Sequence, residues 1–299
     1  MRGVRTRPFR PTAAAALVAV ALLAGCQGEP PDVGATNGQP IGPHDEYVAL
    51  GDSYTAAPFT GDKDSDDGCV RSDVNYPHLV AEELDLDLTD VSCGGATTDS
   101  LDTEQVTVEG SRRPPQLEAL SEDTDLVTIG IGANDFNLFG SLVQQCVVVA
   151  TQDPNGAPCT EADQKNGESE VEGRIDKIRT RLLFAIGQIA DAAPNARVLV
   201  VGYPQFAPAA GTCEALPIAK GDYALARRFN ELINLALVDA AAAADAEFVD
   251  VYTATEGHDI CGEEPWIAGL EPRGDDAAPF HPYPEEQQAV AELIIRKLS

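Results

Sequence analysis

Short apolar runs alternate with longer segments of helical periodicity over most of this 299-residue chain. The apolar runs lie at residues 47–50, 86–91, 126–131, 198–201 and 247–251. Helical spacing of apolar residues is found at residues 76–84, 174–193, 223–244 and 285–298. Buried runs separated by helices are typical of a parallel sheet that is covered on both faces. We therefore predict one α/β domain at residues 46–299, a three-layer α/β/α sandwich around a mostly parallel central sheet.

The first 25 residues have the pattern of an export signal. Four arginines within the first ten residues precede an apolar run at residues 13–24, which is too short to span a bilayer as a permanent helix. The run leads into Leu23-Ala24-Gly25-Cys26, which resembles the bacterial lipobox. That resemblance implies cleavage before Cys26 and lipidation of this residue, which would anchor an exported protein to the cell membrane. The alternative is ordinary cleavage nearby and a secreted protein in which Cys26 has no role.

Residues 26–45 are rich in glycine and proline and contain no core-forming pattern. Such a composition predicts a flexible tether between the anchor and the folded domain. His44 lies in this tether, so we do not expect it to be catalytic.

The charge balance excludes one class of partner. The chain carries 49 acidic and 20 basic residues, a formal net charge of −29. A surface of this sign repels phosphate backbones, so we expect no nucleic-acid partner. Solubility or a salty environment explains the excess of acidic residues adequately. We expect a monomer that requires no cofactor.

Cysteines other than Cys26 are even in number, which in an exported protein indicates disulfides. They are Cys69, Cys93, Cys146, Cys159, Cys213 and Cys261. We expect the sequential pairing, 69–93, 146–159 and 213–261, because it closes three separate loops and the strand order places each pair on one side of the sheet. No cysteine pair has the spacing of a zinc site, and no metal is expected.

Ligands of parallel α/β sheets bind beyond the carboxyl ends of the strands, and three candidate segments lie there. Ser53 follows the first strand and could be a nucleophile if a base takes its proton. Gly95 follows the second strand, where a backbone N–H could face a developing oxyanion. Asn134 follows the third strand and could donate to the same oxyanion. Alone, these residues could equally be a turn, a loop and a helix cap.

The candidate base is His281. It lies between Pro279 and Pro282, immediately before the last predicted helix, and the prolines stiffen the backbone around it. The other histidines are less suitable. His78 falls within a predicted helix, and His258 lies beside Cys261, where a surface role is the simpler interpretation.

Together these segments resemble the SGNH, or GDSL-type, hydrolase family. Its blocks place Ser, Gly, Asn and His in this chain order, which Ser53, Gly95, Asn134 and His281 match. The resemblance implies a flavodoxin-like SGNH fold and a metal-free serine esterase or lipase. It implies that His281 activates Ser53, while the N–H groups of Ser53 and Gly95 and the Asn134 amide form the oxyanion hole. Tyr54 stands where the family name has Leu, at a position we interpret as variable and not chemical.

One position departs from the family pattern. The family usually has an Asp three residues before the His, and here that residue is Ala278. The resemblance allows a backbone carbonyl in its place, as in some secreted members. Asp276 is the alternative acid, with Asp275 beside it.

Two further functions remain open at this point. The same catalytic set would serve a carbohydrate deacetylase, and a non-catalytic envelope lipoprotein could use the fold for binding. We favour hydrolysis of lipid or other apolar acyl esters at the cell envelope. The apolar positions after Asn134, from Phe136 to Val143, could line an acyl site, but a core-facing helix is the simpler interpretation.

Overall fold

A computed structural model describes residues 3, 40–63, 66–107 and 109–299. The expected export signal, Cys26 and most of the expected tether lie outside these residues. No helix in the described part of the chain combines the length and apolarity that a bilayer crossing requires.

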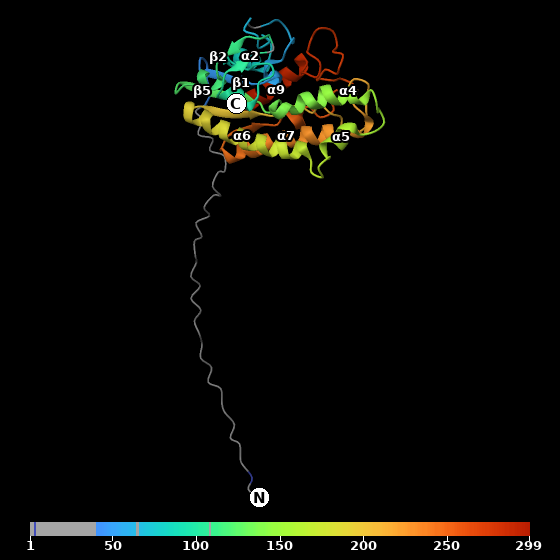
Figure 1. Cartoon of the computed structure of the whole chain (residues 1–299). Helices are drawn as coiled ribbons and strands as arrows, with labels where there is room; N and C mark the ends of the chain where they lie inside the picture. The colour runs from blue at the N-terminus through green and yellow to red at the C-terminus, as the bar shows by residue number, and fades with distance from the viewer. Residues whose placement is uncertain (1–2, 4–39, 64–65, 108) are drawn as a thin grey trace. The chain divides into compact units, whose positions relative to one another are not determined.

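A five-stranded, all-parallel sheet forms the centre of the folded domain (Figure 1). Its order is β2-β1-β5-β6-β7. The strands are β1 (Glu46–Gly51), β2 (Asp87–Asp90), β5 (Thr124–Gly130), β6 (Arg197–Val201) and β7 (Glu247–Val249). A separate antiparallel pair consists of β3 (Gln105–Val106) and β4 (Arg112–Arg113). The predicted mostly parallel sheet is confirmed.

Helices cover both faces of the sheet. Figure 1 shows α6 (Glu170–Ala192) and α7 (Tyr223–Ala243) side by side on one face. The other face packs against α2 (Tyr76–Leu84) and α9 (Pro284–Leu298). Because strand side chains alternate, β1 serves both layers. Val48 and Leu50 join the core under α6 and α7, whereas Tyr47 and Ala49 join the core under α2 and α9.

The shorter helices lie in the connections. They are α1 (Ser53–Ala56), α3 (Leu138–Gly140), α4 (Cys146–Ala150), α5 (Pro158–Asp163) and α8 (Val251–Ala254). Short 3₁₀ turns are η1 (Thr98–Leu101), η2 (Gln116–Ala119), η3 (Asp135–Asn137) and η5 (Lys220–Asp222), and η4 (Ser141–Gln145) is a π-helical turn. The segment from α3 to α5 follows β5. It consists of several short helices, whereas we expected a single helix there.

Capping explains two of the predicted boundaries that differ from the structure. Helix α6 begins at Glu170 instead of residue 174, because the Ser169 hydroxyl accepts a hydrogen bond from the Glu172 N–H at 3.1 Å. The last strand ends at Val249 instead of residue 251. There the Asp250 carboxylate accepts from the Thr253 N–H at 3.0 Å and starts α8.

Three disulfides join cysteines that are neighbours in sequence order. They are Cys69–Cys93, Cys146–Cys159 and Cys213–Cys261. The first pair links the segment after α1 to the loop after β2. The second closes the segment from α3 to α5, and the third joins the loops that follow β6 and α8.

Candidate active site

Ser53 stands at the point where β1 ends and α1 begins, and it is only 7% exposed. The preceding Asp52 caps this short helix, since its carboxylate accepts from the Tyr54 N–H at 2.9 Å. Gly51 is required at the end of the strand, because a Cβ there would lie 2.9 Å from the Gly130 carbonyl oxygen. The sharp turn therefore fixes the Ser53 side chain at the carboxyl edge of the sheet.

His281 faces this serine across 228 residues of sequence. Its Nε2 lies 2.9 Å from the Ser53 hydroxyl oxygen, and its Nδ1 lies 2.8 Å from the Pro279 carbonyl oxygen. A carbonyl can only accept, so Nδ1 carries the proton and Nε2 presents its lone pair to Ser53. This is the tautomer that a general base requires.

Burial lowers the pKa of His281 below its usual value, and the Pro279 carbonyl acts in the opposite direction with a smaller effect. The imidazole lies against two aromatic rings, Tyr54 at 5.5 Å and Phe139 at 6.2 Å between centroids. Apolar surroundings disfavour the charged form of the ring. Burial therefore favours the neutral form of the imidazole, which is the form that can accept a proton.

The position of the family carboxylate is occupied by backbone. Ala278 has no polar side-chain atom, and the group that faces Nδ1 is the Pro279 carbonyl. Asp275 and Asp276 are exposed, and no hydrogen bond or ion pair between described residues joins either of them to His281. The geometry corresponds to the backbone alternative and does not favour Asp276.

The backbone N–H groups of Ser53, at the end of β1, and of Gly95, in the loop after β2, have no acceptor within the described part of the chain. Gly95 has a φ of 75°, a left-handed conformation that glycine adopts without strain. The Asn134 side chain reaches the same loop, where its Nδ2 donates to the Ala96 carbonyl at 3.0 Å. That bond uses one of two amide hydrogens, so a second one remains available. The Asn134 side chain does not form the helix-capping bond that was the alternative interpretation.

A buried carboxylate ties the loop after β5 to the loop after β2. Asp135 accepts from the N–H of Thr98 at 2.8 Å and from the Thr98 hydroxyl at 2.5 Å. Arg181 of α6 approaches the same carboxylate at 3.2 Å. Through these bonds Asp135 fixes the spacing between Asn134 and the Gly95 loop.

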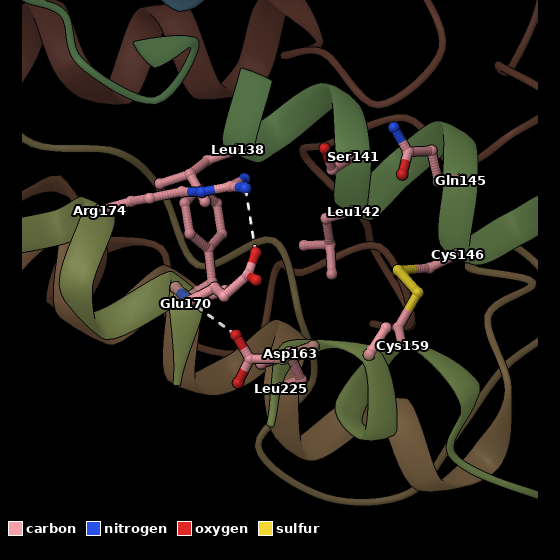
Figure 2. Close-up of a pocket in the computed structure, with 13 residues that line it drawn as sticks. Leu138, Ser141, Leu142, Gln145, Cys146, Cys159, Asp163, Glu170, Arg174 and Leu225 are labelled. Atoms are coloured by element: carbon pink, nitrogen blue, oxygen red, sulfur yellow. Dashed lines mark hydrogen bonds and ion pairs between the residues drawn. A yellow bond between two sulfur atoms is a disulfide. The ribbon is translucent and has the colours of Figure 1, made fainter. Parts of the chain in front are cut away.

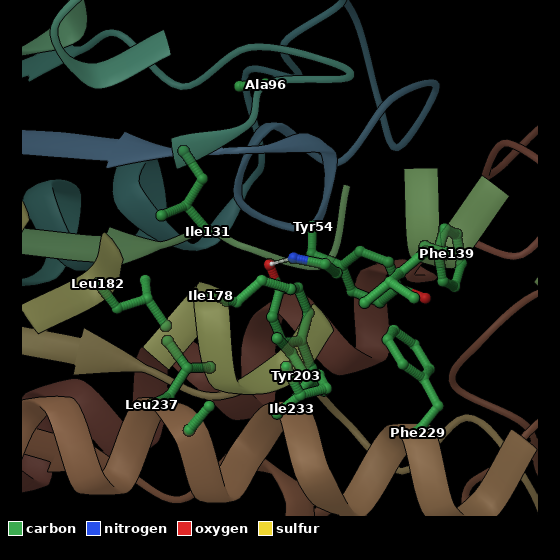
Figure 3. Close-up of a cluster of buried hydrophobic side chains, with 14 of the residues drawn as sticks. Tyr54, Ala96, Ile131, Phe139, Ile178, Leu182, Tyr203, Phe229, Ile233 and Leu237 are labelled. Atoms are coloured by element: carbon green, nitrogen blue, oxygen red, sulfur yellow. Dashed lines mark hydrogen bonds between the residues drawn. The ribbon is translucent and has the colours of Figure 1, made fainter. Parts of the chain in front are cut away.

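A second buried network joins the loop after β1 to the loop after β5, and sequence reasoning missed it. The Tyr203 hydroxyl donates to the Asp52 carboxylate at 2.6 Å and accepts from the Ala133 N–H at 3.0 Å. Burial raises the pKa of Asp52 to about 7, although the bonds from Tyr203 and Tyr54 oppose this rise. Figure 3 shows Tyr203 beside Tyr54 within the buried cluster under α7. The sequence signal that could have identified Tyr203 is its position two residues after the predicted strand at residues 198–201.

Position 54 was interpreted from the sequence as variable and without a chemical role, but Tyr54 makes a specific contact near His281. Its hydroxyl donates to the Phe280 carbonyl at 2.8 Å, one residue before the base. By contrast, the other histidines make contacts that do not involve Ser53. His258 stacks on Trp266 with ring centroids 3.8 Å apart, and the His78 Nδ1 lies 2.7 Å from the Asn75 side chain.

A separate pocket of about 170 Å³ lies under the segment from α3 to α5. Figure 2 shows Leu138 and Leu142 on one side, the Cys146–Cys159 disulfide on another, and the ion pair of Arg174 with Glu170 at the edge. None of the expected catalytic residues lines it. Leu138, Phe139, Leu142 and Val143 are buried, which agrees with a core-facing segment, and two of these residues also line the pocket.

A parallel α/β sheet with a Ser–His pair and free N–H donors at its carboxyl edge defines a serine hydrolase. Comparison with known proteins makes this specific. The model of the GDSL-like Lipase/Acylhydrolase family matches residues 49–289, and the chain belongs to this family. It is a carboxylic ester hydrolase of the lipase and esterase type.

Several relatives support the assignment. Lipase 2 of Streptomyces coelicolor is 34% identical over 254 residues, which cover 83% of each chain. An esterase of Streptomyces scabiei is 28% identical over 307 residues, covering 90% of this chain and 87% of the esterase. The crystal structure of phospholipase A1 from Streptomyces albidoflavus NA297 is similar with a TM-score of 0.65 and 26% identity, covering 86% of this chain and 100% of that one.

Proposed function

We propose that Ser53 and His281 form a catalytic dyad for two-step acyl transfer. The observation that carries this proposal is the 2.9 Å contact between the Ser53 hydroxyl and His281 Nε2, with the Nδ1 proton held by a carbonyl. His281 takes the hydroxyl proton as Ser53 attacks the ester carbonyl carbon. The same proton then goes to the departing alcohol, leaving an acyl-enzyme.

Deacylation reverses these roles. His281 takes a proton from water, the resulting hydroxide attacks the acyl carbon, and Ser53 leaves with the proton returned by His281. In both tetrahedral intermediates the negative oxygen lies near the free N–H groups of Ser53 and Gly95 and the second amide hydrogen of Asn134. Such fixed donors stabilise charge that develops only in the transition state.

The preferred substrates are esters of lipids or other apolar acyl groups. A lipase and a phospholipase A1 are among the similar proteins. Apolar surface is present near the dyad as well. Phe59 is 59% exposed, and its neighbour Pro58 accepts a hydrogen bond from Ala278 in the loop that carries His281. Phe139 packs against the base itself.

A matched pair of measurements tests this function. Ser53→Ala should lower kcat on nitrophenyl esters by roughly 10⁶ and abolish labelling by a fluorophosphonate, with circular dichroism unchanged. A variant that kept a tenth of its activity would remove Ser53 from the role of nucleophile. The wild-type enzyme should prefer nitrophenyl esters of longer acids to the acetate and to acetylated xylan. The reverse preference would favour a carbohydrate deacetylase.

We also propose that the domain at residues 46–299 works outside the cell, held by a lipid on Cys26 after removal of residues 1–25. Residues 26–45 would be the tether. The sequence Leu23-Ala24-Gly25-Cys26 supports the lipid, and a similar protein, from Streptomyces rimosus, is described as an extracellular lipase. Cys26→Ser should move the enzyme out of the membrane fraction or stall its maturation. Normal maturation with unchanged membrane association would contradict the anchor.

A further inference from the structure

The loop that presents the base has an unusual backbone. Phe280 has a φ of 64°, although it is a bulky and buried residue. Such a conformation is rare outside glycine and persists only where the surroundings hold it. It is found here between Pro279, whose carbonyl faces the imidazole, and His281 itself. The direction of the Pro279 carbonyl therefore depends on the conformation of the next residue.

Backbone bonds hold several groups of this loop, including the Phe280 N–H, which donates to the Gly269 carbonyl at 3.3 Å, but the Phe280 carbonyl is held by a side chain. The Ala278 N–H donates to the Pro58 carbonyl at 3.0 Å. The Phe280 carbonyl accepts from the Tyr54 hydroxyl at 2.8 Å in a buried position. Tyr54 directly follows the nucleophile in sequence, and its ring packs against that of His281. One residue therefore contacts both halves of the dyad.

We propose that Tyr54 is a positioning residue for His281, which fixes the Phe280 backbone so that the Pro279 carbonyl stays on Nδ1. This inference rests on the proposed Ser53–His281 dyad. Where a carboxylate orients the histidine, its charge and its packed side chain set the direction of the bond. Here the acceptor is a peptide carbonyl without charge, so its direction must come from the loop. Tyr54 supplies the side-chain bond at Phe280, next to the Pro279 carbonyl, whereas the Thr60 hydroxyl holds the loop further along, where it donates to the Pro282 carbonyl at 3.1 Å.

The test is Tyr54→Phe, which removes the hydroxyl and keeps the ring contacts with Phe139 and Tyr203. The matched control is Tyr47→Phe. Tyr47 is also a buried tyrosine near the start of the sheet, and its hydroxyl lies 2.8 Å from the Thr128 hydroxyl, in the core under α2 and α9. We expect Tyr54→Phe to lower kcat about tenfold or more with KM within twofold. Tyr47→Phe should change kcat less than twofold.

A second readout separates positioning from a general loss of stability. Burial lowers the pKa of His281, and the Pro279 carbonyl raises it with a smaller effect. If Tyr54→Phe loosens the carbonyl, the acidic limb of the kcat/KM profile should move to lower pH. The groups packed on the imidazole are the Ser53 hydroxyl and the Tyr54 and Phe139 rings, none of them charged in this range.

An unchanged kcat in Tyr54→Phe, or a loss that Tyr47→Phe shares, would overturn the inference. Failure of the dyad itself gives a different result, because Ser53→Ala or His281→Ala would then remain active whatever Tyr54 does. The two hypotheses are thus tested by different variants in the same assay.

Discussion

The hydroxyl of Tyr203 lies 2.6 Å from the Asp52 carboxylate, and both residues are buried at the carboxyl edge of the sheet. This bond connects the end of β6 to the end of β1. Since the same hydroxyl accepts from the Ala133 N–H, it also holds the loop that carries Asn134. The spacing between Ser53 and Asn134 therefore depends on a residue in the loop that follows β6.

Tyr203→Phe should destabilise the domain by about 1–3 kcal/mol, the cost of leaving buried polar groups unpaired. The Tyr203 bond lowers the pKa of Asp52, which burial raises to about 7. Without that bond the pKa of Asp52 in the folded state rises further. Ionisation of the Asp52 carboxylate then costs more free energy in the folded protein. The destabilisation should thus be larger at pH 8 than at pH 5, as measured by urea unfolding. A pH-independent difference would show that the charge of Asp52 is not involved.

Glu286 offers a second test of buried charge. It lies in the first turn of α9, is 2% exposed, and has a pKa raised to about 8 by burial. The pKa of Glu286 in the folded state exceeds its unfolded value near 4.5. The contribution of Glu286 to the stability of the folded state is therefore fully present below pH 4.5 and is lost as the pH rises through 8. Glu286→Gln should therefore raise Tm at pH 8–9 by a few degrees, with little change at pH 4.5. Thermal unfolding at the two pH values measures this, and an equal shift at both would contradict it.

The position of the Pro279 carbonyl on His281 Nδ1, where a triad would have a carboxylate, predicts a particular pattern of activity losses. His281→Ala should be almost inactive. Asp275→Asn and Asp276→Asn should each lower kcat less than about tenfold, because both are exposed and the carbonyl of Pro279 faces Nδ1. Removing a true triad Asp costs about 10⁴ in kcat. A thousandfold loss in either Asn variant, with circular dichroism unchanged, would restore a triad.

The Cys69–Cys93 disulfide should matter for rate as well as for stability. Cys93 lies two residues before Gly95, and the Cys69 carbonyl accepts from the Gly94 N–H at 2.9 Å. Replacing both cysteines by serine should cost roughly 3–4 kcal/mol on the chain-entropy model and lower kcat at least severalfold, because the N–H of Gly95 loses its fixed position. The Cys213–Cys261 double variant is the control. It should lose comparable stability but keep most of its kcat, and equal losses of kcat in both would refute the link to the Gly95 loop.

The sheet and the Ser–His pair could be predicted because both leave local signals. Apolar runs mark the strands, and in a parallel sheet their carboxyl ends meet at one edge. Ser53, Gly95 and Asn134 each follow such a run, and the prolines around His281 single out the base. Residue periodicity and block order are sufficient for these assignments.

The supporting contacts could not be predicted, since they depend on which side chains meet across the core. Tyr203 follows a strand like the others, but nothing in the sequence pairs it with Asp52. Glu286 stands in the first turn of a helix, where an acidic residue is ordinarily exposed and favourable to the helix dipole. The left-handed Phe280 and its bond to Tyr54 become visible only once the loop is built.

The Ser53–His281 contact joins distant parts of the domain, with Ser53 at the end of β1 and His281 just before α9. A ribosome or an export channel releases the serine long before the histidine. If these two residues are the proposed dyad, a chain whose His281 segment has not yet folded has no base for its serine. The proposed chemistry can begin only when the segment around His281, 228 residues after Ser53, has packed against the end of β1.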